Sequence, residues 1–168
     1  MRTSISRFLL VGLLGCTLLS VGPIAQQPPK KEEPKTTLGK LLREKNRARG
    51  LIANSRARLR AEVVSLGGDS GSTPAQICCS SNIERLEKRI ISMGPLMREL
   101  QACYEQSGNV DGELQLNFVR SDAEQLFKAT RDFRDASEQQ VMFHLGAMIR
   151  TFLNLEKSTA ELTECPEP

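Results

Sequence analysis

The chain has 168 residues, of which 39% are hydrophobic and 26% are charged, a composition too apolar for a disordered protein and suited to one globular domain. Aromatic residues make up only 4% and tryptophan is absent, which disfavours a β-sandwich and favours a helical core of Leu, Ile, Met and Ala. The formal net charge is only +3, so a strongly charged surface would have to come from an uneven distribution along the chain.

The N-terminal segment is typical of an export signal. Arg2 and Arg7 form a basic start, and the apolar run at 8–21 is shorter than the ~20 residues that a membrane-spanning helix takes. Cleavage after Ala25 is one processing route, and lipidation of Cys16, which ends a lipobox-like LLGC, is a second. An uncleaved anchor is a third, and all three place the folded domain outside the cytoplasm, as a periplasmic, secreted or membrane-tethered protein.

A stiff, solvated linker follows the signal. The sequence QPPKKEEPK at 27–35 holds three prolines and five charged residues, which disfavours a packed element. We therefore expect three parts, which are a signal peptide at 1–25, a linker at 26–36 and a helical domain at 37–165.

The first helix is expected at about 37–66, because Thr36 or Thr37 can cap it and Gly67 with Gly68 would stop it. Its apolar or small stripe recurs at helical spacing but is thin. The stripe consists of Leu38, Leu41, Ala48, Ile52, Ser55, Leu59, Val63 and Leu66.

The second helix, at about 74–106, has the clearest start in the chain. Thr73 is expected to cap it, Pro74 occupies the first helical position and Gln76 completes a capping box. Pro95 should kink this helix without ending it, because the apolar register continues on both sides. Apolar positions recur in an unbroken heptad pattern, at Cys79, Ile83, Leu86, Ile90, Met93, Met97, Leu100 and Tyr104.

The last third allows two interpretations. Residues 113–118 alternate between polar and apolar, but a lone strand would lack a partner, so we expect a helical start or an extended strap. A polar stretch at 134–140 contains Ser137 and Gln140, a second capping-box match. Either two helices lie at about 113–136 and 138–164, or one long helix spans both.

We expect an all-α, antiparallel up-down four-helix bundle, because four helices of comparable length can bury one another's apolar stripes. The alternative is three long helices, packed like a coiled coil. The stripe of the last third that would be buried in either case consists of Val119, Ala123, Leu126, Thr130, Phe133, Val141, Leu145, Met148, Phe152, Leu155 and Leu162.

Charge is strongly segregated along the chain. Residues 38–66 hold eight Lys or Arg against two Glu, whereas 110–168 hold six against eleven Asp or Glu. The basic helix could simply lie beside the acidic third, or it could meet a protein partner or an anionic membrane surface. Nucleic acid is disfavoured, because the basic helix has no aromatic residue on which a base could stack. The arginines of this helix that we expect to meet a partner are Arg43, Arg47, Arg49, Arg56, Arg58 and Arg60.

Four cysteines would remain in the exported domain, and an oxidising compartment favours disulfides. Cys78 and Cys79 are adjacent, and neighbouring cysteines rarely bridge because the ring is strained. An up-down bundle brings the ends of the second and fourth helices to one pole, which predicts a Cys103–Cys165 disulfide. Three long helices would instead bring Cys165 to the pole of Cys78 and Cys79.

Catalytic motifs are absent from the sequence: it has no HExxH, no Gly-rich phosphate loop and no GxSxG, so we expect no enzyme. A metal or haem site would have to use His144, the only histidine, with Met or Cys ligands. The CxxCH haem motif is absent, and we expect no cofactor. The sequence thus predicts a structural or interaction module of the cell envelope, with a metal- or haem-binding bundle as the alternative.

Overall fold

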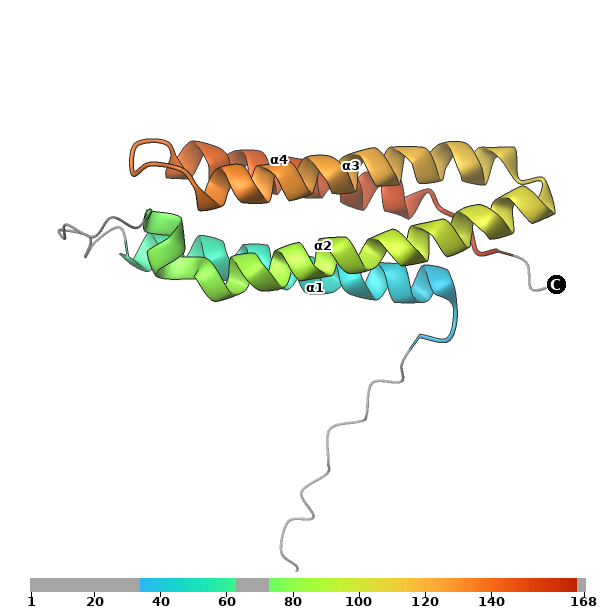
Figure 1. Ribbon diagram of the computed structural model, residues 1–168, viewed down its shortest axis with the longest axis horizontal. Helices are drawn as coiled ribbons and strands as arrows, with labels where there is room; N and C mark the ends of the chain where they lie inside the picture. Colours follow the sequence, from blue (N-terminus) through green and yellow to red (C-terminus); the bar gives the residue numbers. More distant parts are fainter. Residues whose placement is uncertain (1–33, 63–72, 166–168) are drawn as a thin grey trace, which may run out of the picture. The chain divides into compact units, whose positions relative to one another are not determined.

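The computed structural model describes residues 34–62 and 73–165, and four helices account for nearly all of them (Figure 1). The export signal, the lipidation site at Cys16 and most of the proline-rich linker lie outside the described residues. Within the described ranges there is no strand, and no helix has both the length and the apolarity that a membrane crossing requires.

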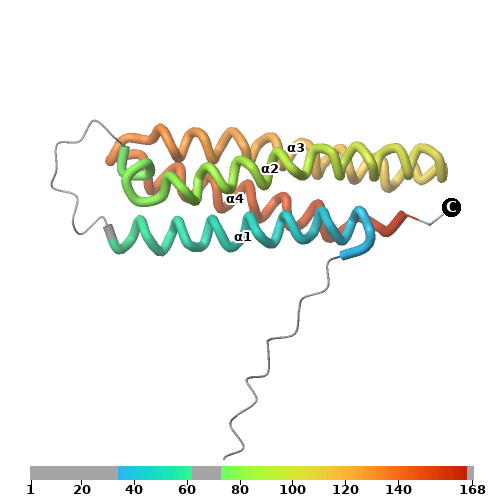
Figure 2. Tube along the Cα trace, turned by 60° about the horizontal axis from the view of Figure 1, so that its bottom comes forward, coloured from blue at the N-terminus to red at the C-terminus, as the bar shows by residue number. Residues whose placement is uncertain are grey.

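The helices pack antiparallel in chain order, which confirms the four-helix bundle and rules out three long helices. Helices α1 and α2 form one hairpin and α3 and α4 a second, with α2 packed on α3 (Figures 1 and 2). α1 also contacts α4, through fewer residues than any of the other three pairs. The four bounds are α1 at Thr37–Glu62, α2 at Pro74–Ser107, α3 at Val110–Arg134 and α4 at Val141–Ala160.

The starts of α1 and α2 follow the capping rules that the sequence displays. The Thr36 hydroxyl oxygen accepts the Gly39 backbone N–H at 3.0 Å, so Thr36 caps α1. Thr73 and Gln76 form the complete capping box of α2, with each side chain bound to the backbone N–H of the other residue. α2 then continues through Pro95 to Ser107 without interruption.

The turn between α2 and α3 is tighter than expected. Gly108 has a φ of 66°, a left-handed conformation that glycine adopts without steric cost, and its N–H bonds back to the last turn of α2. Asn109 immediately caps α3, because its Oδ1 accepts the Gly112 N–H at 2.9 Å. Residues 113–118 are therefore helical, and α3 begins three residues earlier than predicted.

The predicted cap of the fourth helix is wrong. Ser137 lies in a turn, and its hydroxyl donates to the Gln140 side chain rather than accepting a backbone N–H. The backbone carbonyl of Ser137 instead accepts the N–H groups of Gln140 and Val141, which closes a turn before the helix. α4 consequently begins at Val141, three residues later than predicted.

A single apolar core runs along the bundle. Every described member of the three predicted stripes is buried, including all eight heptad positions of α2. Tyr104 and Phe133 are the largest of the fully buried side chains. The Tyr104 hydroxyl donates to the Thr163 carbonyl at 2.6 Å, which satisfies its polar group and fixes the chain after α4. Burial, which disfavours the charged phenolate, raises the pKa of the Tyr104 phenol.

The structure also places the cysteines. The Cα atoms of Cys103 and Cys165 lie 6.3 Å apart with their sulfurs at bonding distance, at the pole where α2 ends and the chain leaves α4. Contrary to expectation, it also joins the sulfurs of Cys78 and Cys79, whose Cα atoms lie 3.7 Å apart within α2. That separation is shorter than the 4.4–6.8 Å usual for disulfides because the two residues are neighbours in the chain, whereas the separation of Cys103 and Cys165 lies within this range.

Truncation of the α2 core should destabilise the bundle. Leu86 is 1% exposed, and its replacement by Ala should lower the free energy of unfolding by roughly 2–5 kcal/mol because it removes buried methyl groups and leaves a cavity. Glu84 is exposed on the same helix, and Glu84→Ala should change that free energy by less than about 0.5 kcal/mol. Urea unfolding followed by circular dichroism measures both, and equal losses would mean that another face of α2 is buried.

Non-reducing peptide mapping by mass spectrometry of the oxidised protein should recover a peptide pair that joins Cys103 to Cys165. The bridge would close a loop of about 60 residues, and in the chain-entropy model it would stabilise the fold by roughly 4 kcal/mol. The same map decides whether Cys78 and Cys79 are joined. A bridge from Cys165 to either of those two would contradict the antiparallel order of the helices.

Candidate functional site on the outer face of α1

Seven of the eight cations of α1 lie on two flanks of the helix, and the eighth, Arg43, falls between the flanks. At 100° per residue, Lys45, Arg49, Arg56 and Arg60 fall on the flank toward α4, and Lys40, Arg47 and Arg58 fall on the opposite flank, toward α2. Small residues and amides occupy the outward face between the flanks, all of them exposed. They are Asn46, Gly50, Ala53, Asn54, Ala57 and Ala61. We call these two flanks and the strip between them the basic face.

The first half of α1 neutralises part of its own charge. Glu44 is 7% exposed, and its carboxylate accepts hydrogen bonds from Arg47 at 2.7 Å and from Arg89 of α2 at 3.0 Å. Arg43 lies 3.9 Å from the same carboxylate, and the Ser92 hydroxyl donates to it at 3.4 Å. This buried carboxylate therefore joins α1 to α2, and it occupies Arg43 and Arg47.

Among the side chains described in 34–61 and 73–165, none supplies such a counter-charge to the second half of α1. Arg56, Arg58 and Arg60 are exposed, and none of the three forms an ion pair or hydrogen bond with another of these side chains. Like charges along one helix raise its positive potential, and an anion that approaches this end meets donors that are not already engaged. The six arginines singled out from the sequence thus divide into a paired group and an open group.

The pKa of Lys45, on the flank of α1 toward α4, is lowered by its surroundings. Burial, and secondarily the charge of Arg49, lowers the pKa of the Lys45 ammonium. The Arg49 guanidinium is itself paired with Glu156 of α4. On the flank toward α4, Arg49 thus has a carboxylate partner, whereas Arg56 and Arg60, about two and three helical turns further along, have none among the described residues.

A groove of about 510 Å³ follows this flank between α1 and α4. Arg49, Arg56 and Arg60 line its α1 side, and Glu156 is the one carboxylate among its lining residues. Its apolar lining includes buried side chains and Leu153, which is 55% exposed. The basic face therefore adjoins accessible apolar surface as well as water.

Of the two helices in the acidic last third of the chain, α4 contacts the basic helix α1, through fewer residues than it contacts α3. α3, which carries several of the carboxylates, packs against α2 and α4. Arg49–Glu156 is an ion pair between α1 and α4, and a hydroxyl–carboxylate bond joins Thr36 to Glu164 at the end of the bundle. The sequence allows the interpretation that the carboxylates of neighbouring helices neutralise the charge of the basic helix. Among the arginines on the flank toward α4, this is so for Arg49 alone within the described residues.

His144, the residue proposed for a metal or haem site, is partly exposed and makes an edge-to-face ring contact with Phe143, with 5.4 Å between centroids. Across the described parts of the chain, no three His, Cys, Asp or Glu side chains are grouped where they could hold a metal ion.

Two features of the site were missed in the sequence. Glu44 lies three residues after Leu41 and four before Ala48, so helical spacing could have placed it beside the buried stripe, whereas its partner Arg89 comes from α2 and could not be found from local spacing. The outward strip from Gly50 to Ala61 could have been found by projecting α1 onto a helical wheel. Comparison of the chain with protein-family models, with curated proteins and with solved structures finds no match.

Proposed function

We propose that this chain is an exported, non-enzymatic interaction module of the cell envelope that docks on an anionic membrane surface through the basic face of α1. The observation that carries the proposal is the open group of Arg56, Arg58 and Arg60, which have no counter-charge among the described residues. Each basic side chain close to an anionic bilayer contributes about 1 kcal/mol to binding.

The arrangement of the basic face supports a broad, flat partner. Arg58 lies on one flank and Arg56 and Arg60 on the other, so a narrow acidic segment that contacts one flank would leave the other unsatisfied. A planar array of anionic head groups reaches both flanks at once. The small side chains between Gly50 and Ala61 let the helix approach such a plane closely, while arginine side chains extend sideways to the head groups.

The N-terminal sequence supports the same location. A basic start, an apolar run at 8–21 and a charged, proline-rich linker are the features of an exported chain, and Cys16 would add a lipid anchor on one processing route. One lipid chain alone gives only marginal membrane binding, so a second, electrostatic contact such as the basic face would stabilise attachment.

Removal of the open arginines should weaken binding to anionic vesicles. We expect the full-length triple variant Arg56→Gln, Arg58→Gln, Arg60→Gln to partition about a hundredfold more weakly into vesicles that contain phosphatidylglycerol, because three cations of about 1 kcal/mol each are lost. Vesicle co-sedimentation measures the partitioning. The difference should shrink as salt is added, since exposed charges are screened beyond about 10 Å at 0.1 M.

A control variant with the same change in net charge separates the basic face from bulk charge. Arg85, Lys128 and Arg150 are exposed on α2, α3 and α4, and their triple replacement by Gln should leave most of the binding intact. Equal losses in the two triple variants would contradict the proposed face. Equal binding of the wild-type chain to neutral phosphatidylcholine vesicles and to anionic vesicles would contradict the anionic partner.

A further inference from the structure

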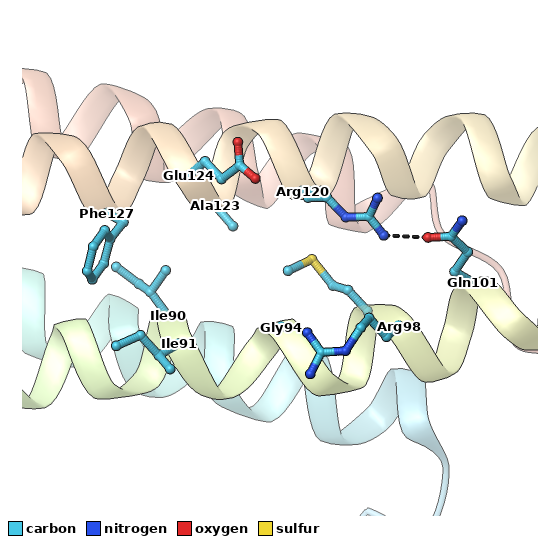
Figure 3. A pocket seen from close by; sticks show the side chains of 10 residues that line it. Ile90, Ile91, Gly94, Arg98, Gln101, Arg120, Ala123, Glu124 and Phe127 are labelled. Atoms are coloured by element: carbon cyan, nitrogen blue, oxygen red, sulfur yellow. Dashed lines mark hydrogen bonds between the residues drawn. The ribbon is translucent and has the colours of Figure 1, made fainter.

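A second groove lies between α2 and α3, on a side of the bundle that the proposed membrane contact does not use (Figure 3). Its volume is about 540 Å³, within the range of small-molecule binding sites. Three buried side chains, Ile90, Met97 and Ala123, form the floor. The groove is therefore mostly apolar, as sites for small organic ligands are.

The two ends of this groove differ in chemistry. Phe127, Ile90 and Ile91 gather at one end, and Arg98 and Arg120 lie toward the other (Figure 3). Ile91 is 62% exposed, an unusual state for a large aliphatic side chain beside a groove. A ligand that fits this arrangement has an apolar body and an anionic head.

The two guanidinium groups are placed differently. Arg120 of α3 donates a short hydrogen bond to the Gln101 side chain of α2, which holds its guanidinium across the groove. Arg98 forms no ion pair or hydrogen bond within the described residues, and its Nη1 lies 3.8 Å from the position that a Cβ on Gly94 would occupy. Because Gly94 has no side chain, the Arg98 guanidinium can lie back over the helix at the edge of the groove.

The apolar end is held in place from outside the groove. The guanidinium carbon of Arg131 lies 4.6 Å from the centroid of the Phe127 ring, a cation–π contact. This contact restrains the ring of Phe127, which lines the groove. A ligand that binds there would therefore lose less side-chain entropy than if the ring were free to rotate.

We propose that the groove between α2 and α3 binds a fatty acid with a chain of about twelve carbons, with the hydrocarbon chain along Phe127, Ile90 and Ile91 and the carboxylate between Arg98 and Arg120. A carboxylate has two oxygens, and each can accept hydrogen bonds from a guanidinium group. The apolar lining supplies the larger part of the contact area, because burial of methylene groups is the main driving force for such a ligand.

Glu124 also lines the groove, and it opposes the ligand. Its carboxylate is exposed and forms no ion pair within the described ranges, so it lowers the positive potential that the two arginines create. The lining residues still carry two positive charges against one negative charge. Neutralising Glu124 should therefore strengthen fatty-acid binding, whereas neutralising either arginine should weaken it.

Isothermal titration of the full-length chain with dodecanoate tests the proposal. We expect Arg98→Gln and Arg120→Gln each to weaken binding about tenfold, since a hydrogen bond to a charged group is lost. Glu124→Gln should strengthen binding by a few-fold because a repulsive charge is removed. Dodecyltrimethylammonium, which has the same tail and a cationic head, should bind at least tenfold more weakly than dodecanoate.

Matched controls come from the same helix. Arg85 and Ile77 are exposed on α2 and do not line the groove, so Arg85→Gln and Ile77→Ser should leave dodecanoate binding unchanged, whereas Ile91→Ser should weaken it. Thermal unfolding of each variant shows whether it is folded. The proposal is overturned if dodecanoate does not bind, if the cationic amphiphile binds equally well, or if folded Arg98→Gln and Glu124→Gln variants both bind as the wild type does.

Discussion

Burial of the apolar face of α2 holds the bundle together, because α2 packs against α1 on one side and against α3 on the other. Its eight heptad positions from Cys79 to Tyr104 are all buried, which fixes how α2 is rotated about its own axis. That rotation determines the surroundings of its polar residues. Arg89 is directed to Glu44 of α1, whereas Arg98 lies at the groove beside α3.

The same packing decides which charges remain available. In the first half of α1, Glu44 pairs with Arg47 of its own helix and with Arg89 of α2. Glu156 of α4 pairs with Arg49. Nothing among the described residues supplies a carboxylate to Arg56, Arg58 or Arg60. The bundle thus uses part of a strongly basic helix for its own stability and leaves the rest exposed.

The sequence predicts the core well because apolar periodicity and capping are local signals. Thr73 and Gln76 form the expected cap, and every described stripe residue is buried. The prediction is wrong at Ser137, where a backbone-closed turn takes the place of a side-chain cap. The pairing of Glu44 with Arg89 and the groove between α2 and α3 depend on contacts between residues of different helices, so no local pattern reveals them.

An exposed apolar stripe on α3, formed by Val110, Leu114 and Phe118, is an alternative membrane contact to the basic face. Paramagnetic relaxation in NMR spectra of the full-length chain, bound to anionic vesicles with spin-labelled head groups, distinguishes the two directly. Docking through the basic face predicts the strongest signal loss at the amides of Gly50, Ala53 and Ala57, with α3 little affected. Strongest loss at Leu114 and Phe118, with α1 unaffected, would contradict the account.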